Sequence, residues 1–389
     1  MAHDPLSDVV VRQYSKWVYP EPIIDLDQWL LNNWQWFDPS HAHQIFWPDR
    51  PYPEDLDILI AGCGTNQAAI IAHTNPSARV TAIDVSQPSL DHHSFLKQKY
   101  KLDNLDLHLL PIEKVGDLGR DFDLIISTGV LHHMASAEQG MEALAQRLRP
   151  AGVAAIMLYA RYGRIGVEMM QAVVRDMGWP QDEATLPLVR ALLSSLPQDH
   201  PIKSYLSLAP DLQYDAGLVD TFLHGRDRSF TIEDCRTLAE GAGLVFQDLF
   251  LKSSYYPTDG LNDGLQGTLR GLPAEKLWSV MERINHRNAC HFFLACRADR
   301  PAEEYRISFD PAEASAMVPA FRFRCGLSGQ QIQQPNWSRL VTSDELAVVS
   351  RIDGQRSLAD IARITGVSQT FSICERLWQQ DFLNILIRR

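Results

Sequence analysis

Residues 57–67 read DILIAGCGTNQ, and residues 80–84 read VTAID. The first segment is an apolar strand that runs into a tight glycine turn, and the second is an apolar strand that ends in a carboxylate. Asp84 follows Gly62 by 22 positions, with room for a helix between the strands. Such strands build a nucleotide-shaped pocket at the carboxyl ends of a parallel sheet. The sequence therefore predicts an α/β fold in which Asp84 accepts hydrogen bonds from a ribose.

The position of a third glycine separates two kinds of nucleotide site. The G-x-G-x-x-G fingerprint needs a glycine at position 67, so that the helix N-terminus can face a pyrophosphate. This chain has Gln67 at that position. A pocket that binds a ribose but lacks the phosphate-binding turn fits a nucleoside ligand without phosphate. The common ligand of this kind is S-adenosylmethionine (SAM), which we predict here.

Two later segments continue the pattern. Residues 122–134 read FDLIISTGVLHHM, and residues 148–160 read LRPAGVAAIMLYA. Together with the segments AGCGTNQ and AIDVS, they resemble in order and spacing the successive motifs of the class I SAM-dependent methyltransferases. The resemblance is close over residues 55–160 and looser to residue 298. It implies a doubly wound, mostly parallel sheet of seven strands and SAM-dependent methyl transfer.

The resemblance assigns SAM contacts to the loops that follow the first four strands. The assigned residues are Gly62, Cys63, Gly64, Asn66, Gln67, Asp84, Val85, Ser86, Pro111, Ile112, Glu113, Thr128, Gly129 and Val130. Many relatives have an Asp after the third strand that accepts the adenine amino group, but Pro111 stands at that position here. The adenine contact therefore falls to backbone groups and apolar side chains, or to Glu113.

Hydrophobic periodicity places the secondary structure elements. Strands are expected at 57–61, 79–84, 105–110, 122–127, 153–159, 244–251 and 290–297, and helices at 66–74, 86–100, 137–148 and 231–241.

Residues 161–229 form an insertion between the fifth and sixth strands. A structureless loop of this length is uncommon in a compact domain, so we expect helices, at 163–177 and 185–196. Insertions at this point lie over the carboxyl ends of the strands. We therefore expect this lid to select the substrate.

One candidate substrate cluster lies at the exit of the fifth strand. Arg161 and Arg164 could hold a carboxylate or phosphate in a planar, two-pronged pairing, or they could solvate the start of a helix. Tyr162, between them, is a candidate catalytic residue.

A second cluster lies at 220–228. Asp220 and Arg226 are candidates for substrate binding, and His224 is a candidate general base because the ordinary pKa of histidine is close to neutral. A salt-linked surface loop is the alternative.

His132 and His133, which follow the fourth strand, also allow a catalytic and a structural interpretation. His133 is a candidate catalytic residue, although the second histidine of such an LHH run often orients the loop in this family. A metal site would need further ligands from elsewhere in the chain, and the sequence signals none. We therefore expect no metal.

The first 54 residues contain five of the nine tryptophans, at 17, 29, 34, 36 and 47. We expect helices at 7–17 and 25–36, separated by prolines, in a cap that packs over the cofactor pocket. Most of these aromatic residues suit the core of the cap itself. Tyr14 and Tyr19 are candidates for substrate contact, since a phenol both stacks and forms hydrogen bonds.

The C-terminal region reads as a separate unit. The polar, irregular stretch over 299–335 suits a linker, and the pattern over 336–389 weakly resembles a small winged-helix module. Its near-neutral charge offers little support for DNA binding. Dimerisation, peptide docking and plain packing remain open as its role, so the chain could form a homodimer.

Composition sets limits on compartment and partners. A net charge of −12 argues against nucleic acid as the main partner. The chain has no run of 18 apolar residues and no signal-like start, which argues against a membrane span or secretion. Six cysteines without C-x-x-C spacing favour reduced thiols and a cytoplasmic protein.

The sequence therefore predicts an enzyme that transfers a methyl group from SAM to an oxygen or nitrogen atom of a small-molecule or peptide acceptor. No N-P-P-[YF] tetrad follows the fourth strand, which disfavours amide or exocyclic-amine methylation of the kind that motif supports, and no catalytic cysteine motif is present, which disfavours pyrimidine C5 methylation. The alternative is a SAM-binding regulatory or interaction protein without catalysis.

Overall fold

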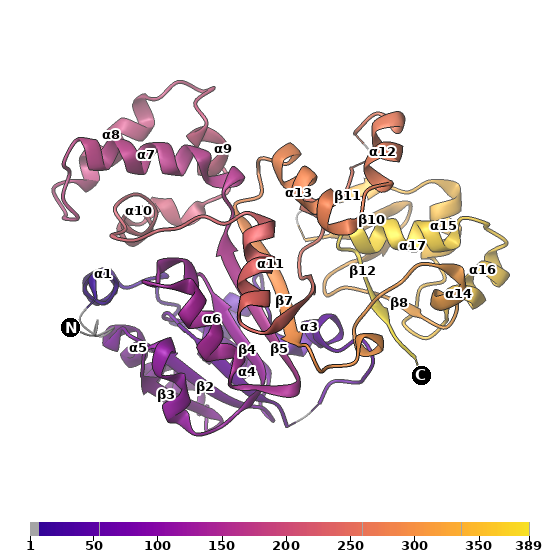
Figure 1. Cartoon of the computed structure of the whole chain (residues 1–389), viewed down its shortest axis with the longest axis horizontal. Helices are drawn as coiled ribbons and strands as arrows, with labels where there is room; N and C mark the ends of the chain where they lie inside the picture. Colours follow the sequence, from indigo (N-terminus) through magenta and orange to yellow (C-terminus); the bar gives the residue numbers. More distant parts are fainter. Residues whose placement is uncertain (1–7, 54, 259, 336, 389) are drawn as a thin grey trace.

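A central sheet of seven strands organises the computed structural model, which describes residues 8–53, 55–258, 260–335 and 337–388 (Figure 1). Ser7, where the first helix is expected to begin, lies outside the described residues. The strand order is β3-β2-β1-β4-β5-β7-β6, and β7 runs antiparallel to the other six strands. The strands are β1 (Asp57–Ala61), β2 (Arg79–Asp84), β3 (Leu105–Leu109), β4 (Phe122–Thr128), β5 (Leu148–Tyr159), β6 (Leu244–Leu249) and β7 (Cys290–Arg297). This arrangement confirms the predicted seven-stranded, mostly parallel α/β fold.

Helices cover both faces of the sheet. They are α3 (Pro39–Phe46), α4 (Gln67–Thr74) and α5 (Gln87–Tyr100) on one face, and α6 (Ala137–Ala145) and α11 (Ile232–Gly241) on the other. Side chains of β1 alternate between the two cores, with Ile58 and Ile60 on the first face and Leu59 on the second. Because both faces are covered, β1 is buried at every position and reads as a continuous apolar run.

Strand β5 begins earlier than the sequence predicts. Leu148 pairs with Phe122, the register then shifts, and regular pairing resumes between Val153 and Leu124. The expected start at residue 153 therefore marks the end of this irregularity rather than the start of the strand.

The glycine turn after β1 receives the N-terminal segment. Gly62 has φ +78°, and a Cβ there would lie 2.3 Å from Cγ2 of Val130, so only glycine fits. Thr65 Oγ1 donates to the carbonyl of Pro20 at 2.7 Å, and Asn66 Nδ2 donates to the carbonyl of Glu21 at 2.9 Å. These bonds hold the N-terminal cap directly on the turn.

The cap contains α1 (Val9–Lys16), α2 (Leu26–Leu30) and α3. The helix expected over 25–36 ends at Leu30. A separate helix, α3, then begins with Asp38 as its N-cap, whose side chain accepts from Ser40 N at 2.9 Å.

The lid is helical, as its length predicts. It contains α7 (Ile165–Asp176), α8 (Leu186–Ser195), α9 (Ile202–Leu206) and α10 (Asp215–Phe222), with the short 3-10 helices η4 (Tyr162–Arg164) and η5 (Pro210–Gln213). These helices share an apolar core of their own that includes Val167, Val189 and Phe222. In Figure 1 the lid lies at the upper left, above the sheet.

The C-terminal region is a folded module on the opposite side of the molecule from the lid (Figure 1). It contains α14 (Pro311–Ala314), β8 (Val318–Phe321), β9 (Gly326–Ser328), β10 (Gln331–Gln334), β11 (Trp337–Leu340), α15 (Ser343–Val349), α16 (Leu358–Thr365), α17 (Thr370–Gln379) and β12 (Leu383–Leu386). Two further helices, α12 (Asp263–Arg270) and α13 (Ala274–Ile284), lie between β6 and β7.

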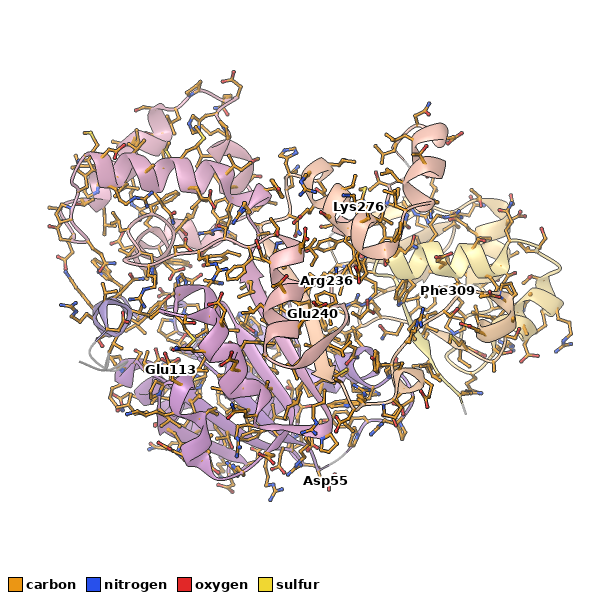
Figure 2. The ribbon with its side chains drawn as sticks, in the orientation of Figure 1. Asp55, Glu113, Arg236, Glu240, Lys276 and Phe309 are labelled. Atoms are coloured by element: carbon orange, nitrogen blue, oxygen red, sulfur yellow. The ribbon has the colours of Figure 1, made fainter. Side chains whose placement is uncertain are left out.

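The structure has strands and core residues over 299–335, where the sequence predicts a linker. Within it, β8 pairs with β12, and Val318 and Ile332 lie in the same core as Leu377. Phe309 packs against Trp378 with ring centroids 5.5 Å apart (Figure 2). The segment reads as polar because its strands are short and edge-like, but it completes the core of the module.

Asp381 anchors this module on the segment that follows β6 of the seven-stranded sheet. Its carboxylate accepts from the backbone N–H groups of Lys252 at 3.0 Å and Ser253 at 2.9 Å, and it pairs with Arg322 at 2.6 Å. Asp381 is buried. Hydrogen bonds to a buried charge are among the stronger polar contacts in proteins.

Among the described residues, none of the helices has the length and apolar character that crossing a membrane requires.

Asp381→Ala should lower the free energy of unfolding by about 2–4 kcal/mol, because two backbone donors and the Arg322 guanidinium lose their buried partner. Chemical denaturation measures this loss. Asp360→Ala is the control, since Asp360 pairs with Arg363 at the exposed surface and its removal should leave stability nearly unchanged. Equal stability of the two variants would contradict the anchoring role of Asp381.

Candidate functional site

A cavity of about 680 Å³ lies at the carboxyl ends of β1, β2 and β4, beneath the N-terminal cap and the lid. All the residues predicted to contact SAM line it, except Ser86: Gly62, Cys63, Gly64, Asn66, Gln67, Asp84, Val85, Pro111, Ile112, Glu113, Thr128, Gly129 and Val130. Ser86 is fully buried, caps α5 and donates to the carbonyl of Tyr14 at 3.2 Å. The structure therefore brings the predicted cofactor residues together around one space.

Asp84 ends β2 inside this cavity. Its carboxylate accepts from the backbone N–H groups of Gly64 and Ser86, each at 2.9 Å. Burial raises the pKa of Asp84 to about 6, against the opposing effect of these hydrogen bonds. These two hydrogen bonds fix the carboxylate at the wall of the cavity.

Gln67 occupies the place of the third glycine. Its Nε2 donates to Thr128 Oγ1 at 3.1 Å, so its side chain connects the start of α4 to the end of β4. Gln67 lines the cavity, so a side chain stands there where the dinucleotide fingerprint has its third glycine.

Five of the described tyrosines line the cavity, and four of them form a group with two carboxylates on its lid side. Tyr14 and Tyr159 donate to opposite oxygens of Asp220, at 2.6 Å and 3.1 Å, and Tyr19 donates to Asp211 at 2.9 Å. Tyr205 completes the group.

These phenols are neutral donors. Burial and the nearby Asp220 raise the pKa of Tyr14 and of Tyr159 well above the ordinary value, and burial with Asp220 and Asp211 does the same for Tyr19. The three phenols therefore stay protonated and hold the carboxylates by hydrogen bonds without adding charge.

His133 and His224 stack beside this group, with ring centroids 3.8 Å apart. His133 Nδ1 lies 2.9 Å from the carbonyl of Arg226, so Nδ1 carries the hydrogen and Nε2 offers a lone pair. His224 Nδ1 accepts from the N–H of Arg226 at 2.9 Å, so its Nε2 carries the hydrogen. Burial and the neighbouring His133 lower the pKa of His224 to about 3.

Each of the two imidazole rings has a second nitrogen, Nε2, which does not bond to Arg226. Nε2 of His133 and Nε2 of His224 are both buried and have no hydrogen-bond partner among the described residues. His133 lines the cavity, while His224 supports it from behind.

His133, Asp220 and His224 each place one potential ligand atom within 4.8 Å of the other two. Two imidazoles and a carboxylate are a common set of metal ligands. However, a metal binds an imidazole lone pair, and the Arg226 N–H uses that of His224. The hydrogen bonds of this cluster suit proton transfer better than metal binding.

Arg164 lies behind the cavity wall. It is 1% exposed, its guanidinium lies 3.6 Å from the ring centroid of Tyr159, and it donates to Tyr205 Oη at 2.8 Å and Asp227 at 2.9 Å. Its contacts position two tyrosines of the wall, and it is not among the lining residues.

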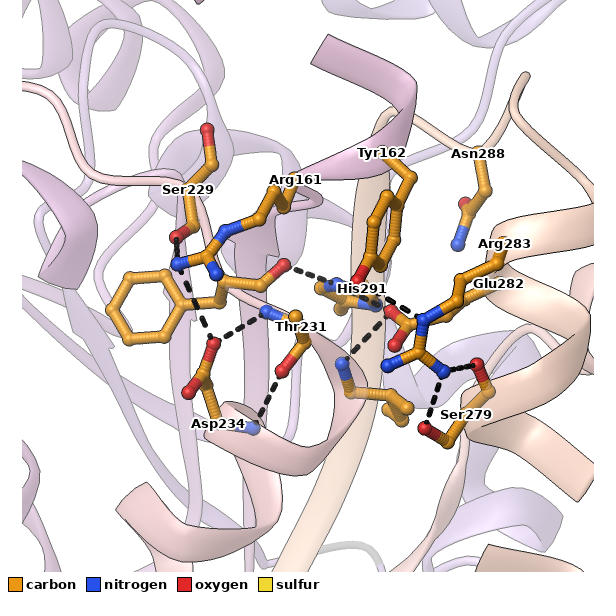
Figure 3. Close-up of polar contacts among 12 residues, drawn as sticks. Arg161, Tyr162, Ser229, Thr231, Asp234, Ser279, Glu282, Arg283, Asn288 and His291 are labelled. Carbon is orange, nitrogen blue, oxygen red and sulfur yellow. Dashed lines mark hydrogen bonds and ion pairs between the residues drawn. The ribbon is translucent and has the colours of Figure 1, made fainter. Parts of the chain in front are cut away.

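Arg161 and Tyr162 point to a different polar cluster, shown in Figure 3. Arg161 lies 3.5 Å from the carbonyl of Ser229 and 3.8 Å from Asp234, and Tyr162 Oη accepts from Arg283 Nε at 3.1 Å. The structure does not bring these two residues to the cavity. Of the predicted substrate residues, Tyr14, Tyr19, Asp220 and Arg226 line the cavity, and Arg226 pairs with Asp8 at 3.0 Å.

Sequence reasoning missed several lining residues, among them Tyr159, Tyr205, Asp211 and Cys290. Tyr159 is visible as the last residue of an apolar strand, where side chains of parallel sheets reach the site. Asp211 sits in η5, a short helix whose sequence carries no periodic signal.

Comparison with known proteins agrees with this geometry. Residues 59–154 match a family model described as a methyltransferase domain. An uncharacterized protein of Synechococcus sp. is 27% identical over 353 residues, which cover 88% of this chain and 83% of that protein. The structure of PKMT2 from Rickettsia typhi is similar, with a TM-score of 0.65 at 16% identity over 95% of this chain and 77% of the other. PKMT2 in complex with AdoHcy gives a TM-score of 0.63 at 16% identity, over 90% of this chain and 75% of the other.

The matched domain contains the glycine turn, Asp84 and the exit loop of β4, which form the floor of the cavity. The full-length structural similarity extends the same fold through the sheet and the regions beyond it. Residues 59–154 of this chain therefore match a methyltransferase domain, and the chain has the fold of the class I SAM-dependent methyltransferases.

Proposed function

We propose that this chain transfers the methyl group of SAM to an oxygen or nitrogen atom of an acceptor that binds under the lid. One observation carries the proposal: a single cavity joins the cofactor floor to the Tyr14, Asp220 and His133 group. A regulator that only bound SAM would not need this second, polar half. The two halves together supply both a cofactor site and an acceptor site.

The floor residues would hold the cofactor. Asp84 is placed to accept hydrogen bonds from the ribose, and the turn at Gly62 lets the backbone approach closely. When bound, SAM supplies an electrophilic methyl group on a sulfonium. The protein's part is to align the acceptor, exclude water and remove a proton when the acceptor carries one.

His133 is the best-placed general base. Its Nδ1–H is fixed by the Arg226 carbonyl, which leaves the lone pair of Nε2 without a partner among the described residues, and His133 lines the cavity. His224, proposed from sequence as the base, presents an N–H instead and stacks on His133. We assign His224 the role of holding the His133 ring in position.

The lid borders part of the mouth of the cavity, where the lining residues Leu208 and Tyr214 are 41% and 44% exposed. The lining residues Pro20 of the cap and Glu113 after β3 are exposed as well. Among the described residues, none after Cys290 lines the cavity, and the C-terminal module therefore does not contribute to it. These features support a small acceptor, or one narrow end of a larger one.

Asp84→Ala should weaken SAM binding by roughly 1–3 kcal/mol, the value expected when hydrogen bonds to a charged group are lost. Isothermal titration calorimetry measures the affinity. Asp91→Ala on the exposed side of α5 is the matched control and should bind SAM normally. If Asp84→Ala binds SAM as tightly as the control does, Asp84 does not contact the ribose.

SAM binding should also weaken as the pH falls through about 6. The pKa of Asp84 is raised to about 6, so the carboxylate that accepts the hydrogen bonds predominates above this pH and is protonated below it. We expect about tenfold weaker binding at pH 5 than at pH 7 from this one site. Asp84→Asn cannot titrate, and its affinity should change far less over the same interval.

His133→Ala should lower kcat by ~10²–10⁴, the usual contribution of a general base, with SAM affinity unchanged. Turnover is followed with radiolabelled SAM and any acceptor that the wild-type chain methylates. His108→Ala, at an exposed position of β3, is the control. His224→Ala should also lower kcat, but less, and a larger loss in His224→Ala than in His133→Ala would reverse the two assignments.

A further inference from the structure

The buried carboxylate of Asp220 has no arginine or lysine partner in the part of the chain that the structure describes. Asp220 is 2% exposed and lines the cavity, and its oxygens accept only from the neutral phenols of Tyr14 and Tyr159. Among the described residues, no arginine or lysine nitrogen lies within 4.0 Å of it. Burying a carboxylate without a counter-charge is costly, and a protein usually avoids it by pairing. A ligand can supply the missing charge.

A second carboxylate strengthens the negative character of this half of the cavity. Asp211 accepts from Tyr19 at 2.9 Å and also has no arginine or lysine partner within 4.0 Å among the described residues. It is partly exposed, in η5 near the mouth of the cavity. Charge of one sign along the walls of a cleft concentrates ligands of the opposite sign.

An independent observation points to a ligand with N–H or O–H donors. His133 is 3% exposed, lines the cavity, and has an Nε2 lone pair without a partner among the described residues. A ring nitrogen of His133 and a carboxylate oxygen of Asp220 lie within 4.8 Å of each other. A group with several donors, placed between them, would satisfy both at once. An ammonium has three such donors and a positive charge.

Anionic acceptors fit this half of the cavity poorly. Of the described lining residues, only Arg226 is an arginine or lysine, and it is already paired with Asp8 at 3.0 Å. A carboxylate or phosphate acceptor would face Asp211 and Asp220 without a free cation to hold it.

We propose that the acceptor is an amine, which enters as an ammonium ion and binds between Asp220 and Nε2 of His133. The proposal rests on the proposed function and specifies its substrate class. The ammonium has no lone pair, so it must lose a proton before it can accept a methyl group. One N–H bond breaks, the proton bonds to Nε2 of His133, and the bonding electrons remain on the amine nitrogen as its lone pair.

A binding experiment tests the proposal without knowledge of the natural acceptor. The wild-type chain is saturated with S-adenosylhomocysteine, and ligand-observed NMR then measures its affinity for n-butylammonium and for the neutral isostere n-butanol. We expect n-butylammonium to bind at least tenfold more tightly. Asp220→Asn, which keeps the shape of the side chain, should remove this preference.

Asp215→Asn is the matched control. Asp215 lies on the same helix as Asp220, but it pairs with Arg190 at the exposed surface and does not line the cavity. Its preference for n-butylammonium should equal that of the wild type. Thermal melting of each variant verifies that it is folded.

The outcomes separate the two proposals. Equal binding of the two probes by the wild type, or an unchanged preference in Asp220→Asn, would overturn the amine assignment. A tenfold loss of S-adenosylhomocysteine affinity in Asp220→Asn would also overturn it, because Asp220 would then belong to the cofactor site. If methyl transfer from SAM is found on a hydroxyl or carboxyl acceptor, the proposed function stands and the amine assignment fails. Failure of the wild type to bind S-adenosylhomocysteine would contradict the proposed function itself.

Discussion

The close approach of three chain segments at one glycine turn is the constraint on which the cofactor site depends. A Cβ on Gly62 would lie 2.3 Å from Val130 Cγ2, and a Cβ on Gly64 would lie 2.9 Å from Cδ of Pro20. The end of β1, the exit loop of β4 and the N-terminal cap therefore meet where no side chain fits. Because Thr65 and Asn66 bond the cap to this turn, the floor of the cavity and part of its roof are positioned together.

The cofactor half could be predicted from sequence because its signals are local. β1 and β2 have the bounds that the apolar runs predict, and Asp84 lies in the cavity beside the turn. A buried parallel strand, a glycine with positive φ and a carboxylate at a strand end each follow from a few neighbouring residues. The seven-stranded order then follows from the family resemblance.

The acceptor half could be predicted only in part, because tertiary packing decides where its side chains point. Arg161, Tyr162 and Arg164 lie within four positions of the sequence, yet Arg164 packs behind Tyr159 while the other two contact Asp234 and Arg283. Asp211 carries no signal of its role, since its partner Tyr19 lies 192 positions away. The prediction of a linker over 299–335 differs from the structure for a related reason. The short strands of this segment contribute to an apolar core only because β8 pairs with β12, which lies far away in the sequence.

Two buried carboxylates of the lid differ in a way that bears on what the cavity receives. Asp227 is paired with Arg164 at 2.9 Å and accepts from Gln171 at 2.7 Å, so its charge is compensated within the protein. Asp220, seven positions earlier, is at least as well buried but is held by phenols alone. The same lid thus places a buried arginine beside one carboxylate and leaves the other to neutral donors. An arginine partner, as at Asp227, is enough to bury a carboxylate in the wall. The carboxylate of Asp220, which has neutral donors instead, keeps a negative charge that a ligand in the cavity can pair with.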